Sequence, residues 1–586
     1  MMINYKSGIV ALCATMLLAT NCKKNTSTTT PGGGGGGGNT GTDSTYKPVD
    51  PTVAATIGFF QDSWAPRTFN VPGTVPGNVP SGSITDSLSI DVNNVLVKVL
   101  PLVYGNNSNL WSGQIVTQAP LVQYLKDLSP NIIRAPAGSV SDVYFWNGTD
   151  ANPAPADVPS TLLDASGNAS QTKWYWYGGN TGSWTFSLDN YYKLLVQTKS
   201  TGIITINYGY ARYGTSANPV AAAAHLAADW VRFDNGRTKY WEIGNETYGN
   251  WEAGYKIDPA TNKDGQTALV TGALYGQHVT VFADSMKAAA KETGATIYIG
   301  ATLYDKPAAS YDYASIQTWN QGVLMKAGNS PDYYIVHDYF TDYNANSSAA
   351  DILKTAASVP GSVMDYVKSQ VAAAGAAIKP VALTEWNLQA AGSKQNVSFI
   401  AGMHAAKTLG SIIKNNFGEA SRWDLANGWS NGDDMGLFNH GDEPGAPLWN
   451  PRPAYYYMYY FQQFFGDRMV KDSLKSVNGD VTSYSSTFSS GQAGTVIINT
   501  GSLNHTVAID FKHFPAGANY YWNVLTGGTD NGSFSGQVYV NGTGPSTASG
   551  GPLNYATLKS YSAPLNGTIK ISVPALSVVY LVADKK

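Results

Sequence analysis

The sequence predicts an α/β protein in which a TIM (β/α)8 barrel is joined to an all-β sandwich. Across residues 100–466, short apolar runs with strand character alternate with longer stretches of helical period. Strands separated by helices pair in parallel, either in a doubly wound sheet or in a barrel. Eight such units over roughly 360 residues fit a TIM barrel with loop insertions. Residues 467–586 lose the helical period, and their short strand-like runs are typical of an antiparallel sandwich.

The barrel strands are expected where apolar, β-branched or aromatic residues run for four or five positions. These runs are residues 100–104, 132–135, 203–207, 240–244, 297–301, 333–337, 380–384 and 422–426. The intervening helices are expected where apolar residues recur at helical spacing over longer stretches. These stretches are residues 188–199, 217–233, 269–292, 349–374, 397–414 and 453–465.

The all-β domain is expected to draw on both ends of the chain. Its C-terminal strands are predicted at residues 494–498, 507–511, 520–524, 536–540, 568–573 and 578–582. Residues 51–99 form a short, alternating N-terminal segment with strand-like runs at 57–60 and 88–92. We expect these N-terminal strands to complete the sandwich at its edges.

The composition excludes several classes of protein. Of 586 residues, 13% are charged and 12% are aromatic, and the net charge is −3. A nucleic-acid-binding protein needs a basic face to neutralise phosphates, and this balance argues against one. Disorder over most of the chain is excluded, because disorder requires many charges and few aromatics. The Tyr, Trp, Asn and Gly content suits a surface that contacts sugars, although a β-rich domain also enriches aromatic residues.

The N-terminus predicts export and anchoring. Lys6 precedes an apolar stretch over residues 8–19, which is the pattern of a signal peptide over residues 1–22. Residues 18–22, Leu-Ala-Thr-Asn-Cys, resemble a bacterial lipobox. The resemblance implies cleavage before Cys22 and lipidation of its thiol, whereas ordinary secretion with an incidental cysteine is the alternative. The protein would then be an exported lipoprotein of the outer membrane or cell surface, attached to the membrane through Cys22 only.

A linker follows the expected cleavage site. Residues 23–50 contain a Ser/Thr run and seven consecutive glycines at 32–38, which is typical of a flexible tether. The only other cysteine, Cys13, lies inside the signal peptide. The mature chain therefore has no disulfide, no cysteine nucleophile and no cysteine-based zinc site.

Two glutamates end predicted barrel strands. Glu246 closes the fourth strand in Trp-Glu-Ile-Gly-Asn-Glu, and Glu385 closes the seventh in Leu-Thr-Glu-Trp-Asn. Catalytic residues of TIM barrels lie where strands end, and strands four and seven face each other across the barrel mouth. Glycoside hydrolysis needs two carboxyl groups that flank the scissile bond. The alternative is that one or both carboxylates are merely exposed loop residues.

These motifs resemble the clan A retaining glycoside hydrolases, most closely the family 51 α-L-arabinofuranosidases, with some similarity to the family 39 β-xylosidases. Further matching segments follow the chain in order. They are Tyr-Gly at 104–105, Ile-Arg-Ala-Pro-Ala-Gly at 133–138, Tyr-Phe-Trp at 144–146, Ile-Asn-Tyr-Gly at 206–209 and Val-His-Asp-Tyr at 336–339. The resemblance implies a TIM barrel with a C-terminal sandwich and a retaining, double-displacement mechanism.

The resemblance also implies a role for each matched residue. Glu246 would be the general acid/base and Glu385 the nucleophile. Asn245 would bond the sugar 2-hydroxyl, and Arg134 would keep Glu385 ionised. Tyr339 would bond the nucleophile. The acid must remain protonated, so we expect Glu246 in a less polar site or beside a negative charge.

Five further positions are expected to contact substrate. His337 would line the same wall as Tyr339, and the remaining four are Asn207, Trp146, Trp251 and Trp386. Three of these have alternatives: His337 as a core histidine, Asn207 as a loop-orienting residue and Trp146 as loop packing. The seven histidines lack metal-ligand spacing, so no metal or cofactor is expected.

One departure from the family pattern leaves the specificity open. The arabinofuranosidases carry a sugar-binding glutamate after the strand-one glycine, whereas this chain has Asn-Asn-Ser-Asn at 106–109. The resemblance implies hydrolysis of plant or algal polysaccharides or their oligosaccharides, with an α-L-arabinofuranosidase as the nearest type. An endo-acting β-glycanase or a β-xylosidase of the same clan is the alternative. A non-catalytic glycan-binding lipoprotein and a metal-dependent hydrolase are weaker alternatives.

Overall fold

The computed structural model describes residues 46–170, 175–310, 312–342, 345–389 and 394–586. Eight parallel strands close into a barrel in the order β10-β11-β12-β13-β14-β3-β4-β9. In chain order they are β3 (Gly105–Asn107), β4 (Ile132–Ala135), β9 (Thr201–Ile206), β10 (Tyr240–Ile243), β11 (Tyr298–Thr302), β12 (Tyr333–Tyr339), β13 (Val381–Asn387) and β14 (Glu419–Arg422). The predicted TIM barrel is confirmed, and β10 and β13 are its fourth and seventh strands.

The first and last barrel strands differ from the prediction. The apolar run at 100–104 forms a 3-10 helix, η2 (Pro101–Tyr104), and the strand is the polar segment that follows it. Pro101 has no N–H to give to a strand ladder, which favours a helical first turn. The last strand starts at Glu419 rather than at residue 422, and all four of its residues are buried. Both strands carry buried polar side chains, so an apolar run does not mark them.

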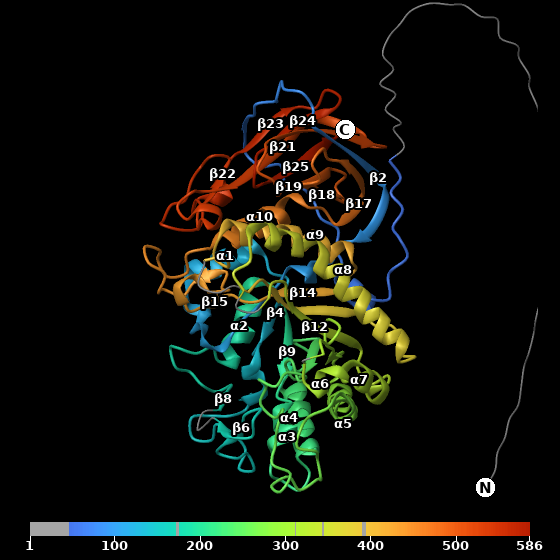
Figure 1. Ribbon diagram of the computed structural model, residues 1–586, viewed down its shortest axis with the longest axis vertical. Helices are drawn as coiled ribbons and strands as arrows, with labels where there is room; N and C mark the ends of the chain where they lie inside the picture. The colour runs from blue at the N-terminus through green and yellow to red at the C-terminus, as the bar shows by residue number, and fades with distance from the viewer. Residues whose placement is uncertain (1–45, 171–174, 311, 343–344, 390–393) are drawn as a thin grey trace, which may run out of the picture. The chain divides into compact units, whose positions relative to one another are not determined.

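Helices surround the barrel and follow the predicted stretches closely (Figure 1). The longer ones are α2 (Leu188–Thr198), α4 (Pro219–Asp234), α5 (Gly272–Thr293), α8 (Ala349–Ala373), α9 (Phe399–Lys414) and α10 (Pro453–Phe464). The prediction omitted α1 (Ala119–Leu128), α3 (Gly209–Tyr213), α6 (Ala314–Gln317) and α7 (Trp319–Ala327). Within the described residues, no helix is both long enough and apolar enough to cross a membrane.

The β domain is one 11-stranded sheet folded around its own core. Its strands are β1 (Thr74–Pro76), β2 (Asp86–Lys98), β17 (Arg468–Lys475), β18 (Val481–Thr487), β19 (Ala493–Asn499), β20 (His505–Lys512), β21 (Ala516–Gly527), β22 (Val538–Val540), β23 (Ser560–Pro564), β24 (Ile569–Val573) and β25 (Ser577–Lys585). Side chains of β2, β19, β20, β21, β24 and β25 share one buried apolar cluster. The predicted sandwich is thereby confirmed.

The N-terminal strands join this sheet as expected, but they do not both lie at its edges. β2 lies between β17 and β20, and Figure 1 shows it as a blue strand beside orange and red ones. It pairs antiparallel with β17 and parallel with β20, and β1 pairs parallel with β23. The sheet is therefore mixed rather than wholly antiparallel.

The N-terminal run at residues 57–60 is not a strand. It begins the 3-10 helix η1 (Gly58–Ser63), in which Phe60 is fully buried. Phe59 stacks on Tyr298 with ring centroids 3.7 Å apart, at the residue where β11 begins. The aromatic rings of η1 thus pack against the end of the barrel opposite to the predicted catalytic glutamates.

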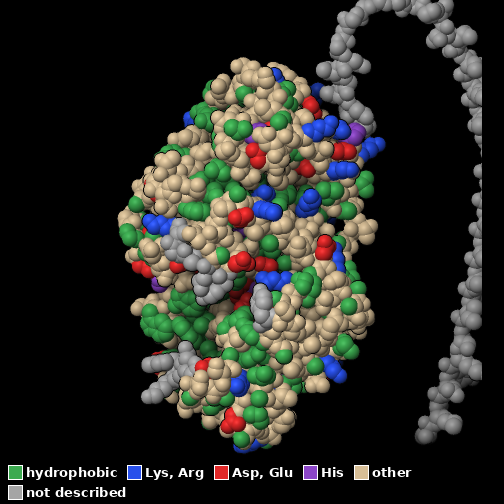
Figure 2. Space-filling view, viewed as in Figure 1, with side chains coloured by type: hydrophobic (Ala, Val, Ile, Leu, Met, Phe, Trp, Pro, Cys, Tyr) green, Lys and Arg blue, Asp and Glu red, His purple; other side chains and the backbone are tan. Residues whose placement is uncertain are grey.

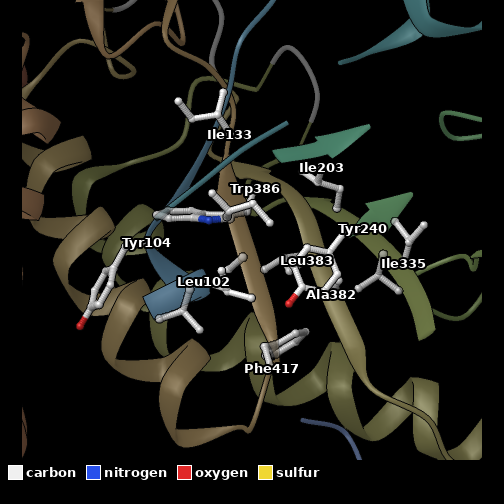
Figure 3. Close-up of a cluster of buried hydrophobic side chains, with 14 of the residues drawn as sticks. Leu102, Tyr104, Ile133, Ile203, Tyr240, Ile335, Ala382, Leu383, Trp386 and Phe417 are labelled. Carbon is white, nitrogen blue, oxygen red and sulfur yellow. The ribbon is translucent and has the colours of Figure 1, made fainter. Parts of the chain in front are cut away.

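Buried apolar side chains of the barrel strands pack against those of the surrounding helices. Figure 3 shows Leu102 and Tyr104 from η2 with Leu383 and Trp386 from β13 in one cluster of buried side chains. Burial of such side chains is the main favourable contribution to folding. On the face shown in Figure 2, charged side chains are scattered among a majority of uncharged ones.

Candidate active site

The two predicted catalytic glutamates lie together at the barrel mouth. Glu385 is in β13, and Glu246 lies three residues after the end of β10. One carboxylate oxygen of each and a ring nitrogen of His337 lie within 4.8 Å of one another. The chain turns sharply before Glu246, because Gly244 has φ +75° and a Cβ there would lie 2.7 Å from Thr247 Oγ1. Glycine permits this turn at the end of the strand.

Arg134, in β4, connects the polar groups of the site. Its side chain is fully buried, with Nε 2.5 Å from Glu242 and Nη1 2.6 Å from Glu385 Oε1. Nη2 donates to Asn245 Oδ1 at 2.8 Å, and Nη1 also reaches Asn107 Oδ1 at 3.1 Å. One planar guanidinium thereby fixes two carboxylates and two amides in a single geometry.

The expected nucleophile is held from two sides. Tyr339, at the end of β12, donates its hydroxyl hydrogen to Glu385 Oε2 at 2.8 Å. Arg134 bonds the other oxygen. Burial and the charge of Glu385 raise the pKa of Tyr339 well above its usual value, so the phenol remains a donor. A carboxylate that accepts from a cation on one oxygen and a phenol on the other is held in one orientation.

The expected acid/base has a different environment. Trp251 Nε1 donates to Glu246 Oε2 at 2.9 Å, and His337 Nδ1 lies 3.1 Å from Oε1. Burial raises the pKa of Glu246, but the hydrogen bond and charge of His337 outweigh it, and the net shift is downward. Burial in turn lowers the pKa of His337, but the charges of Glu385 and Glu246 outweigh it and raise the pKa overall.

This pairing differs from the expectation of a protonated glutamate. His337 Nδ1 faces Glu246 Oε1, and the raised pKa of His337 and lowered pKa of Glu246 together favour a protonated ring opposite an ionised carboxylate. His337 Nε2 also contacts Thr384 Oγ1 at 2.9 Å, which fixes the ring. The proton needed for acid catalysis is therefore held by the pair rather than by Glu246 alone.

The pair predicts a pH-dependent contribution to stability. The pKa of His337 is raised above 6.5, so its contribution is complete below pH 6.5 and is lost as pH rises through the folded value. The pKa of Glu246 is lowered from 4.5, so its contribution is complete above pH 4.5 and is lost as pH falls through the folded value. Both contributions are complete between pH 4.5 and pH 6.5. We therefore expect His337→Gln to reduce the free energy of unfolding most in this range, measured by urea unfolding across a pH series.

A matched control is available in His278. This buried histidine bonds the Tyr208 hydroxyl at 2.9 Å, and burial lowers its pKa to about 4. The folded state resists protonation of this ring, so the cost of His278→Gln should rise as pH rises to the unfolded value of 6.5 and level off above it, which is the opposite trend to that of His337→Gln. A cost of His337→Gln that stays constant from pH 5.5 to pH 9 would contradict the ion pair.

A second layer of carboxyl groups lies behind Asn245. Glu252 Oε1 accepts from Asn245 Nδ2 and from Ser139 Oγ, each at 2.8 Å. Asp142 accepts the backbone N–H groups of Tyr208 and Gly209 at 3.0 and 3.1 Å. Burial, with the neighbouring charges of Asp142 and Glu246, raises the pKa of Glu252 well above its usual range. This layer orients Asn245 toward the site.

Sequence reasoning assigned no role to Glu242, Glu252 or Asp142. A signal existed for Glu242, which is the only charged residue in the otherwise apolar strand β10. A charge on a fully buried strand requires a partner, and that partner is Arg134. Glu252 and Asp142 lie on loops, and nothing in their local sequence marks them as buried.

Three predicted substrate contacts are corrected by the structure. Trp386 is 1% exposed and lies in the apolar core, because it follows Glu385 on a strand and side chains alternate between faces. Trp146 stacks on Trp230 at 5.9 Å and donates to Leu226 O at 3.0 Å, so its ring packs on α4. Asn207 bonds the Tyr144 carbonyl and the Tyr213 hydroxyl, which fits the loop-orienting alternative.

The remaining predicted residues are brought together. Arg134, Asn245, Glu246, His337, Tyr339 and Glu385 form one connected network, and Trp251 joins it through Glu246. Trp251 is 51% exposed, so its ring is open to a ligand beside Glu246. Strand β3 offers no exposed side chain in place of the family's glutamate, because residues 106–109 are all fully buried.

Glu246, His337 and Glu385 could also be considered as metal ligands. Their ligand atoms lie within 4.8 Å of one another, the only such group of three among the described residues. The Arg134 guanidinium, 2.6 Å from Glu385, already supplies a positive charge that would repel a second cation. Each of the three side chains already has hydrogen-bond or ion-pair partners in the protein. The arrangement therefore suits proton transfer better than metal binding.

Comparisons with known proteins support the fold. No family model matches the sequence, and no curated protein matches it either. An α-L-arabinofuranosidase from Thermotoga maritima, solved with arabinose, has a TM-score of 0.59 and 16% identity over 85% of this chain and 99% of that one. A bifunctional glucanase-xylanase from a metagenome library has a TM-score of 0.55 and 14% identity over 86% and 100% of the two chains.

A third similar structure belongs to another glycoside hydrolase family. The family 44 xyloglucanase of Paenibacillus polymyxa, solved with xyloglucan, has a TM-score of 0.53 and 11% identity over 86% of this chain and 100% of that one. All three comparisons cover almost the whole of the solved chains. The chain therefore shares with these glycoside hydrolases the fold of a TIM barrel joined to a β domain.

Proposed function

We propose that this protein is a retaining glycoside hydrolase in which Glu385 is the nucleophile and Glu246 the general acid/base. The observation that carries the proposal is the closeness of the two carboxylates, of which one oxygen each lies within 4.8 Å of the other. Retaining glycosidases place the pair about 5 to 5.5 Å apart, whereas inverting enzymes need about 6.5 to 9.5 Å to admit a water molecule. The fold neighbours are glycosidases, which supports the same assignment.

In the first step, Glu385 Oε attacks the anomeric carbon and forms an ester bond to it. The glycosidic bond breaks with its electron pair going to the leaving oxygen, which takes a proton from Glu246. That proton comes from the His337–Glu246 pair, whose atoms lie 3.1 Å apart. Arg134 and Tyr339 hold Glu385 in position for the attack.

In the second step, water attacks the anomeric carbon and its proton goes to Glu246. The ester bond breaks, and its electron pair returns to Glu385. While Glu385 is esterified, its negative charge is absent, and that charge is the largest cause that raises the pKa of His337. The site thus changes its proton affinity between the two steps, as a group that serves as acid and then as base requires.

The substrate is proposed to be a plant or algal polysaccharide, or an oligosaccharide derived from one. An α-L-arabinofuranoside is the first candidate, since solved neighbours include α-L-arabinofuranosidases. One observation favours an endo-acting enzyme as the second candidate. Asn107 Nδ2 donates to the carbonyls of Thr384, Ser421 and Arg422. Its amide N–H groups are therefore used within the barrel and are not free to bind a terminal sugar.

A leaving-group series tests the role of Glu246. We expect Glu246→Ala to lower kcat/KM for alkyl glycosides by ~10²- to 10⁴-fold, because their leaving oxygen needs a proton. Aryl glycosides with acidic phenols should lose far less, since the phenolate leaves unprotonated. Glu292→Ala, at an exposed glutamate of α5, should leave both unchanged. Equal losses on both kinds of substrate would contradict the assignment.

We further propose that the protein is exported and anchored as a lipoprotein through Cys22. The support is the sequence pattern of residues 1–22, which lie outside the described residues. Incorporation of labelled fatty acid in the native host tests this proposal. The label should be lost in Cys22→Ala, and retention of the label would contradict it.

A further inference from the structure

Four tryptophans form a continuous series of ring contacts that leads away from the barrel mouth. Trp423 contacts Trp111 with centroids 6.3 Å apart, and Trp111 contacts Trp176 at 6.5 Å. Trp176 contacts Trp184 at 5.6 Å in an edge-to-face arrangement. We call these four residues the tryptophan track. They come from the loops that follow β14, β3 and β4, which are neighbours in the barrel.

The inner end of the track belongs to the catalytic mouth. Trp423 directly follows β14, and its carbonyl accepts from Asn387 Nδ2 at 2.6 Å. Asn387 lies two residues after the proposed nucleophile on β13. A Cβ at Gly138 would lie 2.6 Å from the Trp423 ring, so the β4 loop also packs against it. The track is therefore continuous with the catalytic site.

Exposure increases along the track. Trp423 is 7% exposed and Trp184 is 58% exposed, while Trp111 and Trp176 are intermediate. Burial stabilises an indole, and Trp184, the outermost ring, forgoes more than half of that gain. An exposed indole that continues a series of partly exposed rings offers an aromatic face to a ligand. Packing alone does not account for the outer part of the track.

Local contacts hold the rings in place before any ligand arrives. Trp111 Nε1 donates to Asn427 Oδ1 at 3.2 Å, and Trp176 pairs with Tyr144 in a two-stranded sheet. Gln114 Nε2 donates to the Thr181 carbonyl at 2.6 Å, which ties the segment of Trp111 to that of Trp184. A preordered aromatic surface loses little entropy when it binds.

The charge of the surrounding segments limits the kind of ligand. Residues 108–118 and 175–187, which carry three of the four rings, contain no Lys, Arg, Asp or Glu. They are instead rich in Asn, Gln, Ser, Thr and Gly, whose side chains and backbone bond hydroxyl groups. Indole faces and uncharged polar groups fit a neutral sugar chain and would give an acidic one no counter-charge.

We propose that the tryptophan track binds further sugar units of a neutral glycan chain whose cleaved bond lies at Glu246 and Glu385. This inference rests on the proposed glycosidase function and names its substrate class: a chain of several neutral sugars, in place of a single terminal residue. The more exposed rings of the track, Trp111, Trp176 and Trp184, would supply subsites beyond the reacting sugar by stacking of sugar rings on indole faces.

The test compares substrates of different length. The substrates are an aryl glycoside of one sugar and neutral oligosaccharides of increasing length from arabinan, xylan and xyloglucan. We expect Trp184→Ala to lower kcat/KM on the long oligosaccharides by ~10-fold or more, and to leave the aryl glycoside within about 2-fold. Trp184→Phe should restore part of the loss, because it keeps an aromatic face. Phe233→Ala, at an exposed ring on α4, is the matched control.

Each outcome decides between the possibilities. Loss that grows with chain length supports the track, whereas unchanged activity or equal loss on all substrates overturns it. If wild-type protein hydrolyses none of these glycosides, the proposed function fails, and the track is tested by binding to the same polysaccharides in affinity electrophoresis. Retardation that is lost in Trp184→Ala then supports the track alone, and no retardation overturns it.

Discussion

Glu385→Ala is expected to lower kcat by on the order of 10⁴-fold or more, on every substrate that the wild-type enzyme cleaves. Double displacement requires a covalent bond to this carboxylate, and no neighbouring group can replace it. Glu242 is fixed by Arg134 at 2.5 Å, and Glu246 is needed on the leaving-group side. Measurement requires only steady-state hydrolysis of an aryl glycoside. Activity near the wild-type level would contradict the assignment.

Chemical rescue distinguishes a missing nucleophile from a damaged fold. Removal of the Glu385 side chain leaves space beside Arg134 Nη1 and the Tyr339 hydroxyl, which then lack their acceptor. A small anion such as azide should bind there and attack the anomeric carbon from the same side as Glu385. The product should be a glycosyl azide of inverted configuration, whereas the wild-type enzyme should give a sugar of retained configuration by NMR. An unrescued variant that unfolds like wild type would contradict this role.

Arg134→Met is expected to have the largest effect on stability, a loss of about 3–5 kcal/mol in the free energy of unfolding. The guanidinium is fully buried and is the only cation that contacts Glu242 within the described residues. Its removal leaves the buried charge of Glu242 with a hydroxyl donor, Thr205, but no cation, which costs far more than the ion pair itself contributes. Activity should fall as well, because Glu385 and Asn245 lose the group that orients them.

A double variant separates these two effects. Arg134→Met with Glu242→Gln removes the buried charge together with its partner, so most of the lost stability should return. Activity should remain low, since Glu385 still lacks its cation. Arg134→Lys keeps the charge but not the planar fork, and we expect an intermediate result on both counts. Urea unfolding and steady-state kinetics measure the two effects. A double variant as unstable as Arg134→Met would contradict the charge argument.

Much of the barrel could be predicted because its signals are local. Helices α2, α4, α5, α8, α9 and α10 coincide with the predicted helical periods to within about three residues. The strands β4, β10 and β12 are apolar runs between such helices, and their order places Glu246 and Glu385 at strands four and seven. The strand at Gly105–Asn107 is polar, so the apolar pattern predicted a strand at the residues just before it instead.

Whether an individual aromatic ring is buried or exposed could not be predicted from its neighbours in the chain. Trp251 and Trp386 each lie close in the chain to a proposed catalytic glutamate, yet one is 51% exposed and the other 1%. Strand alternation explains Trp386, because Glu385 points into the barrel and the next side chain must point outward. Trp111 and Trp176 are far apart in the chain, and only the closed barrel brings their loops into contact.

The sequence by itself determined the fold class, the paired glutamates and the residues that resemble a known catalytic set. These features depend on hydrophobic periodicity, on the order of the strands along the chain and on short motifs, all of which can be read from neighbouring residues. The tertiary structure alone decided the contact between Glu246 and His337 and the directions of their pKa shifts, the central position of Arg134 and the course of the tryptophan track. The reason is physical: pKa values and binding surfaces depend on burial and on charges across space, between residues that the chain keeps far apart.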